Sequence, residues 1–333
     1  MSTVRANTYL DAAGGNTATI NGMTPTAQSL QGFRNRIING DMRIDQRRAG
    51  AALTPAANGD FLVDRFVFSA TQASRFFGGQ NYNSVTPPAG FTNYAGVQCS
   101  TSQSLAASDF FGIIQRIEGF NTADLAWGSA SASAVTLSFR VYSSLTGTFG
   151  GSVQNSGSTR SYPFSYSIPT ANTWTTIAVT IPGDTSGTWL TNNGQGIQVF
   201  FGLGVGSTFS GTAGSWAGSS LLSATGAVSV VGTAFATFYI TGVQLEAGSV
   251  ATPFERRDYG RELIMCQRYY QGQRCTFQST AILAFTRPVA MRAAPTVSWS
   301  GTVGTVFEMS PDAFVITQNG SGNGLSGLFS AEL

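Results

Sequence analysis

The chain has 333 residues, of which 42% are hydrophobic, 12% aromatic and only 10% charged, and its formal net charge is +2. It contains no histidine, which excludes Ser/His/Asp and Cys/His nucleophile systems and most zinc or iron sites, so an enzyme would have to use carboxylates, Tyr or Arg. All 18 basic residues are arginine and none form a basic stripe, which argues against nucleic-acid binding and favours packed, paired guanidinium groups.

The cysteines and the apolar segments indicate in which cellular compartment the protein assembles. Cys99, Cys266 and Cys275 form neither an even-numbered disulfide framework nor a CxxC zinc motif. The first residues lack a signal-peptide pattern, and no apolar run is long enough to span a membrane. We therefore expect assembly in a reducing cytoplasm, with no membrane insertion, no cofactor and no bound metal.

Residues 1–35 are small and polar, and they contain too few apolar side chains to form a domain of their own. This composition predicts either a disordered tail or an extended arm that becomes ordered on a partner.

Residues 36–257 are rich in short segments in which apolar residues alternate with polar ones. In residues 135–141 the apolar set is Val135, Leu137, Phe139 and Val141, with Thr136, Ser138 and Arg140 on the other face. Segments 177–181 and 197–203 repeat this pattern. Alternation of this kind predicts half-buried antiparallel strands.

Two further segments are expected to be single strands. Residues 61–70 alternate with Asp64 and Arg65 at their centre. Residues 235–246 form the last strand of the series, with Tyr239, Thr241, Val243 and Leu245 predicted to share one face. About eight strands, separated by Gly-, Ser- and Asn-rich turns and interrupted by no helix, indicate an all-β jelly-roll sandwich over residues 36–257.

The stretch from residue 252 onward changes character. Residues 252–255 read TPFE, a capping-box pattern with Pro253 at the first helical position, and Asp258 offers a second N-cap. The run 259–271 is then expected to be helical. Its apolar residues lie on more than one side, so we expect it to pack between its own domain and a second copy of the chain. The predicted oligomer interface comprises Tyr259, Leu263, Ile264, Cys266 and Tyr270.

Strand-like segments follow the helix, and they have many uncharged edges and a modest core. Such small β modules often gain stability by oligomerising. Residues 258–333 are therefore predicted to be a helix plus a C-terminal β module through which the chain trimerises.

A specific series of blocks occurs in this sequence, at residues 34–47, 113–141, 173–190, 200–218, 243–271 and the terminal AEL. Together these blocks resemble the receptor-binding and fibre-like structural proteins of tailed bacteriophages. The resemblance implies a virion protein with a carbohydrate-binding-module-like jelly roll, assembled as a homotrimer. Residues 4–32 look like the attachment ends of such fibres, which implies docking to tail, baseplate or adaptor proteins.

No extended repeat or coiled-coil shaft is present, which departs from the long-fibre pattern. A short tail fibre or tail-tip protein and a head-attached fibre or decoration protein therefore both remain open. In each case the expected location is the virion.

Sugar binding would use aromatic rings against the CH face of a pyranose, with neighbouring amides bonded to its hydroxyls. The candidate residues lie in segments predicted to be loops and are Trp127, Trp189, Trp216, Asn192, Asn193 and Gln195. For each tryptophan the favoured alternative is that the ring caps the core. Trp174 and Trp299 are expected to be packing residues.

A glycan depolymerase is the third alternative, because glycoside hydrolysis needs only two carboxylates. The candidate pairs are Asp41 with Asp45, Asp60 with Asp64, and Glu246 with Glu255. Each could equally belong to a structural ion-pair cluster, and no calcium-binding loop pattern accompanies them. We expect no catalytic residue and no metal site.

Overall fold

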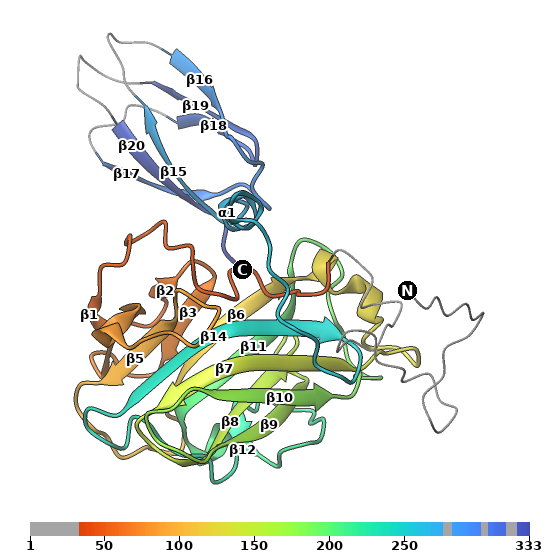
Figure 1. Cartoon of the computed structure of the whole chain (residues 1–333). Helices are drawn as coiled ribbons and strands as arrows, with labels where there is room; N and C mark the ends of the chain where they lie inside the picture. The colour runs from red at the N-terminus through yellow and green to blue at the C-terminus, as the bar shows by residue number, and fades with distance from the viewer. Residues whose placement is uncertain (1–32, 276–281, 301–305, 318–324) are drawn as a thin grey trace, which may run out of the picture.

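The computed structural model describes residues 33–275, 282–300, 306–317 and 325–333. Most of the predicted N-terminal arm, residues 1–32, lies outside the described residues. Two bodies are visible in Figure 1: a large β-sandwich and a small β module above it, with the only α-helix of the described part between them. None of the described helices is long and apolar enough to cross a membrane.

The strands of the sandwich are β1 (Leu53–Ala56), β2 (Phe61–Val63), β3 (Phe66–Ala70), β4 (Phe76–Gln80), β5 (Ala95–Cys99), β6 (Phe110–Glu118), β7 (Val135–Ser143), β8 (Gly147–Gln154), β9 (Ser161–Ile168), β10 (Thr175–Ile181), β11 (Gln195–Val205), β12 (Ser210–Gly211), β13 (Ser223–Ala224) and β14 (Thr237–Ala247). The rest of the chain supplies α1 (Tyr259–Gln267), β15 (Tyr270–Cys275), β16 (Ile282–Thr286), β17 (Thr296–Ser300), β18 (Val306–Met309), β19 (Ala313–Thr317) and β20 (Leu325–Ser330).

Two six-stranded antiparallel sheets form the sandwich. Sheet I has the order β1-β4-β5-β14-β7-β10, and sheet II has the order β2-β3-β6-β11-β8-β9. Neighbours in each sheet are mostly distant in sequence, which is the crossing pattern of a jelly roll and not of a simple meander. The expected all-β jelly roll is confirmed.

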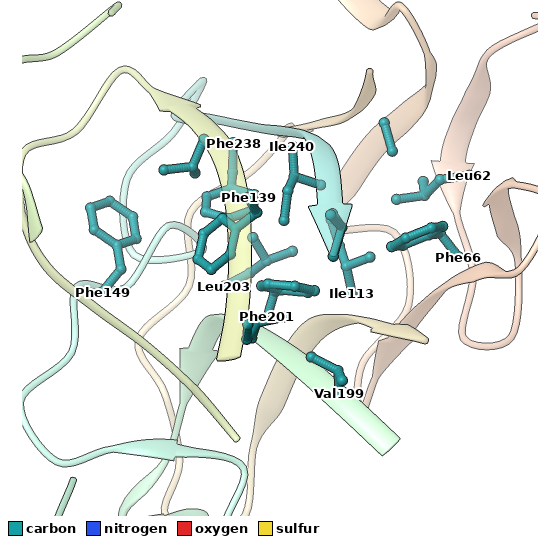
Figure 2. Close-up of a cluster of buried hydrophobic side chains, with 14 of the residues drawn as sticks. Leu62, Phe66, Ile113, Phe139, Phe149, Val199, Phe201, Leu203, Phe238 and Ile240 are labelled. Carbon is teal, nitrogen blue, oxygen red and sulfur yellow. The ribbon is translucent and has the colours of Figure 1, made fainter. Parts of the chain in front are cut away.

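The core lies between the two sheets, where alternate residues of facing strands interdigitate. Figure 2 shows Phe139 of β7, Phe201 of β11 and Phe238 of β14 gathered with Ile113, Leu203 and Ile240. Phe139 and Phe201 meet edge to face at 5.2 Å between ring centroids. Burying one such side chain contributes about 1.5–3 kcal/mol, so the core-facing residues of the alternating segments 135–141 and 197–203 stabilise the sandwich.

Two strand predictions were wrong for reasons of local backbone geometry. Residues 61–70 are two strands, β2 and β3, because Arg65 turns the chain with φ of 72°. In β14 the register shifts between Thr241 and Gln244, where Gly242 has φ of 60°. The bulge exchanges the two faces, so that Ile240 and Val243 both enter the core while Tyr239 lies outside it.

The helix begins at Tyr259, where the second predicted N-cap places it, but it is shorter than the predicted run 259–271. Asp258 is the N-cap and its side chain accepts from the Arg261 amide, as predicted, whereas the TPFE segment is not helical. Instead, Glu255 accepts a hydrogen bond of 2.5 Å from the Asn35 backbone amide. This bond holds the TPFE segment against the segment that precedes β1. The helix ends at Gln267, since Tyr270 already pairs with Ser330 in the next sheet.

The C-terminal module consists of two three-stranded sheets, β15-β20-β17 and β16-β19-β18. Its small core contains Phe314 and Phe329, whose ring centroids lie 4.9 Å apart, and Trp299 packs on both. Trp299 is therefore a packing residue, as expected. The Arg287 side chain, buried here, lies over Phe329 at 4.7 Å.

A polar junction joins the sandwich to α1 and the module. Buried Glu118 of β6 accepts from Arg268 at 2.6 Å and from the Tyr269 hydroxyl at 2.8 Å. Glu332 is ion-paired with Arg47 at 2.9 Å and also with Arg65. Removal from water raises the pKa of Tyr269 to about 12 and lowers the pKa of the Arg65 guanidinium.

Candidate functional site

A groove of about 550 Å³ lies on the outer face of sheet I. Its floor comes from β7 and β10, which run side by side at the front of Figure 1. Ser138 and Arg140 of β7 face Thr176 and Ala178 of β10 there, because these residues alternate with the core-facing ones. Ser138 and Arg140, two of the three residues on the polar face that the sequence predicts, therefore belong to the floor.

The first wall is the long connection between β4 and β5, which carries Phe91. That ring packs down onto β14 at Gly242, where a Cβ atom would lie only 2.7 Å from the Phe91 ring. Glycine is required at this bulge for two reasons, its positive φ and the space it leaves for the ring. The connection is held further along by Tyr94, whose hydroxyl donates to the Tyr82 carbonyl at 2.7 Å.

The second wall is the segment between β14 and α1, which carries Phe254 and Arg256. It is fixed to the outer face of β14, because the Thr252 hydroxyl donates to Glu246 at 2.6 Å and the Glu255 amide donates to Gln244 at 2.7 Å. These bonds are possible only because the bulge turns Gln244 and Glu246 outward. The wall therefore has a defined position relative to the floor.

Phe91 and Phe254 meet across the groove. Their ring centroids are 5.3 Å apart in an edge-to-face arrangement, and both side chains are partly exposed. The Arg256 guanidinium lies over Phe91 at 4.8 Å and near Phe254 at 5.8 Å. Gly90, with φ of 83°, leaves room for it, since a Cβ atom there would lie 3.0 Å from the Arg256 Nη2 atom.

A smaller hollow of about 260 Å³ adjoins the groove and shares Phe91 and Arg256 with it. Asp41 and Arg43 at its edge are paired with each other at 2.5 Å. Together the two hollows present half-buried rings, hydroxyl groups and guanidinium groups. This combination suits a polar ligand that has an apolar face, which is the surface character of a pyranose ring.

The three tryptophans predicted to bind sugar come together at one end of the sandwich, but they contact one another. The Trp127 and Trp189 rings are 4.7 Å apart, and Trp216 lies within 5.6 Å of both. Trp127 and Trp189 are 8% and 9% exposed, and all three indole N–H groups donate to protein oxygens. Rings in this state cap the core, the alternative favoured above, and we place the candidate site elsewhere.

The polar residues predicted to flank these tryptophans serve local structure. The Asn192 side chain accepts from the Gly194 amide at 2.8 Å, and Gln195 pairs with Glu118 at the start of β11. Asn193 donates to the Arg292 carbonyl at 3.1 Å, so it joins the sandwich to the C-terminal module.

The carboxylate pairs proposed for hydrolysis are engaged by their own surroundings. Asp60 faces Arg48 at 3.4 Å, and Asp64 faces Arg47 at 3.4 Å. Asp45 accepts from the Gly50 amide at 2.7 Å in a turn. Glu246 holds Thr252, as described, and burial raises the pKa of Asp64. Each candidate carboxylate thus has a structural role, and the described residues contain no cluster of three metal-binding side chains.

The predicted oligomer interface divides into two groups. Cys266 and Tyr270 are buried by the chain itself, Cys266 packing with Ile38 and Ile44. Their assignment to a surface between copies is corrected, because the segment preceding β1 covers that side of the helix. Leu263 is partly buried, and Tyr259 and Ile264 are 55% and 54% exposed.

The sequence interpretation did not select the groove residues Phe91, Phe254, Arg140 and Arg256. Phe91 ends the segment PPAGF and Phe254 lies in TPFE, and both segments contain Pro or Gly residues typical of loops. Aromatic residues in predicted loops were considered as sugar-binding candidates only when they were tryptophan, and the same rule extended to phenylalanine selects both residues. The contact between them depends on the bulge in β14, which the alternation pattern concealed.

Comparison with solved structures gives distant similarities. The enzymatically active domain of tailspike protein 4 from bacteriophage CBA120 matches at 11% identity, over 64% of this chain and 21% of that chain, with a TM-score of 0.35. A putative sugar-binding protein from Bacteroides thetaiotaomicron matches at 11% identity, over 65% of this chain and 100% of that chain, with a TM-score of 0.34. The module TmCBM61, solved with β-1,4-galactotriose, matches at 9% identity, over 57% of this chain and 92% of that chain, with a TM-score of 0.29.

The chain spans well under two thirds of the tailspike chain that it matches. The sequence matches no protein-family model and no curated protein. At TM-scores this low the similarities carry no functional argument, and the function is inferred from the groove.

Proposed function

We propose that this chain is a carbohydrate-binding protein and that the groove on sheet I is its binding site. The observation that carries this proposal is the pair of half-buried rings, Phe91 and Phe254, held above a hydroxyl-lined floor by two fixed walls. A volume of about 550 Å³ lies within the range of small-ligand sites. The rings would contact the CH face of a sugar, and Ser138, Thr176 and Arg140 would bond its hydroxyls.

We further propose that the protein is a virion component of a tailed phage that binds a bacterial surface glycan. The sequence resemblance supports a short tail fibre or tail-tip appendage, attached to the tail, baseplate or an adaptor through residues 1–35. It also supports assembly of three copies, for which exposed Tyr259 and Ile264 on α1 and Leu328 on β20 offer apolar surface. Antibody labelling of intact particles would separate a tail location from a head location.

The binding proposal predicts that Phe91→Ala weakens oligosaccharide binding about tenfold, because a ring that stacks on a sugar loses its contact area. The measurement is calorimetric titration with hits from an array of neutral and acidic oligosaccharides. Phe120→Ala is the matched control, because Phe120 is 61% exposed and lies outside the groove.

Two results would contradict binding at this site. One is equal affinity of Phe91→Ala and wild type for every array hit, and the other is the absence of any hit. A reducing-end assay on the same oligosaccharides separates binding from hydrolysis, and we expect their length to remain unchanged.

A further inference from the structure

The groove is unusual in its charges. Among the residues that line it, Arg140 and Arg256 are the only charged ones, and neither forms an ion pair within the described part of the chain. Arg140 donates to the Thr176 hydroxyl, and Arg256 makes neither a hydrogen bond nor an ion pair to any described residue. The groove therefore carries positive charge that none of the described carboxylates neutralises.

Other arginines of the sandwich show what neutralisation looks like here. Arg36 is bidentate on Asp124 at 2.6 and 2.8 Å, and Arg160 is bidentate on Asp184 at 2.7 Å. In the adjoining hollow, Arg43 is paired with Asp41, and Arg257 is paired with Glu262 at 3.4 Å. Arg256 lies between these ion pairs and the groove. Its guanidinium is next to the Phe91 and Phe254 rings, whereas the guanidinium of each of the other arginines is next to a carboxylate.

Stacking on Phe91 and Phe254 restricts the Arg256 guanidinium while leaving its N–H donors available. A planar guanidinium is suited to bidentate bonding of a carboxylate, and such charge-assisted bonds are among the strongest hydrogen bonds in proteins. Because the group is already held by its rings, binding an anion costs less side-chain entropy than it would for a free arginine.

We propose that the groove selects an acidic saccharide, one in which a uronic-acid carboxylate pairs with Arg256 while its ring stacks on the adjacent phenylalanines. Arg140 supplies a second cation at the floor. This inference rests on the proposed function and adds the class of glycan. Sulfate esters share the negative charge, and the experiment distinguishes them from uronates.

The test uses the full-length protein and pairs of probes that differ only in charge. Oligogalacturonate and its fully methyl-esterified form share one backbone, and mannuronate oligomers, sulfated galactan oligomers and a neutral galactan complete the set. We expect wild type to bind a uronate oligomer at least about tenfold more tightly than its ester, with affinity that falls as salt is raised from about 50 to 500 mM.

Arg256→Ala is expected to reduce uronate affinity about tenfold or more, down to that of the ester, and to leave ester affinity unchanged. Arg256→Lys is expected to restore only part of the loss, since lysine lacks the fork and the ring stacking. Arg261→Ala is the matched control, being an exposed arginine on α1 outside the groove. Arg256 is itself exposed, so its variants should fold normally.

The two levels of proposal fail differently. Equal binding of acid and ester, with Arg256→Ala unaffected, overturns the acidic preference and leaves glycan binding in place. Preference for the sulfated probe over every uronate overturns the carboxylate assignment. Absence of binding to every probe, acidic or neutral, overturns the proposed function as well.

Discussion

Gly242 shows how one residue connects the core to the candidate site. Its φ of 60° forms the bulge in β14, and the absence of a side chain there lets the Phe91 ring reach the sheet. The same bulge turns Gln244 and Glu246 outward, where they hold the second wall. Both walls of the groove therefore depend on a single backbone position.

We predict that Gly242→Ala destabilises the protein by about 1–3 kcal/mol and weakens glycan binding, because the new methyl group strains the backbone and displaces Phe91. Gly226→Ala is the control, since Gly226 has φ of 79° and no atom lies within 4 Å of the place its methyl group would occupy. Urea unfolding and calorimetric binding would be compared. Gly226→Ala should be destabilised by backbone strain and should bind the glycan with unchanged affinity. Wild-type affinity in Gly242→Ala would refute the dependence of the groove walls on Gly242.

At the level of single residues, the burial of a side chain determined whether its predicted role was confirmed. Trp189 and Trp216 lie in loop segments with polar neighbours, and such segments are equally typical of a binding site and of a loop folded back over the core. The contact between the two rings, 5.6 Å apart, arises from loops at one end of the sandwich whose paths the sequence does not define. By contrast, the N-cap Asp258 was predictable because its bond to Arg261 is local.

At the level of elements, the junction around α1 is polar, although apolar residues on more than one side of the helix predicted apolar contacts there. Glu118, Arg268 and Tyr269 form one hydrogen-bonded group between β6 and the end of the helix. Glu118 and Arg268 are 150 positions apart in sequence, so no local pattern predicts their contact. The segment that carries Ile38 and Ile44 lies on the same helix and provides its apolar cover.

The junction gives a pH prediction. The pKa of Tyr269 is raised from 10.0 to about 12, chiefly by burial, so between these values the unfolded chain loses a proton that the folded chain keeps. The folded state then binds more protons, and the free energy of unfolding decreases as pH rises through this window. Tyr94, with its pKa also raised to about 12, contributes with the same sign.

Tyr269→Phe should therefore reduce the slope of stability against pH between 10 and 12 and leave the part due to Tyr94. Urea unfolding of both proteins at a series of pH values measures the two slopes. Identical slopes in wild type and variant would show that the Tyr269 hydroxyl is not protected in the fold.

At the scale of the whole molecule, the sandwich could be predicted because the alternation of apolar and polar residues recurs in many of its strands. Many strands carry the same alternation, so errors at β2, β3 and β14 did not change the class of fold. The candidate site could not be predicted in the same way, since it is formed where two non-repetitive connections meet over β7 and β10.

Assembly is the remaining property at this scale. We predict that wild type is trimeric at micromolar concentration and that Ile264→Glu shifts it toward monomer, because a charge would be buried between copies. Light scattering coupled to size-exclusion chromatography measures the mass. Phe235→Glu, at a 70% exposed position in the sandwich, should leave the trimer intact. A wild-type protein that is monomeric under these conditions would contradict the interface on α1.

The construction of the groove has a consequence for how such a protein could change its target. Both walls are connections outside the strand ladders, whereas the floor belongs to the sandwich. Loop swaps at residues 81–94 and 248–256 could therefore alter ligand preference while the scaffold retains its packing. A change in ligand preference would then require substitutions in only two short segments of the sequence.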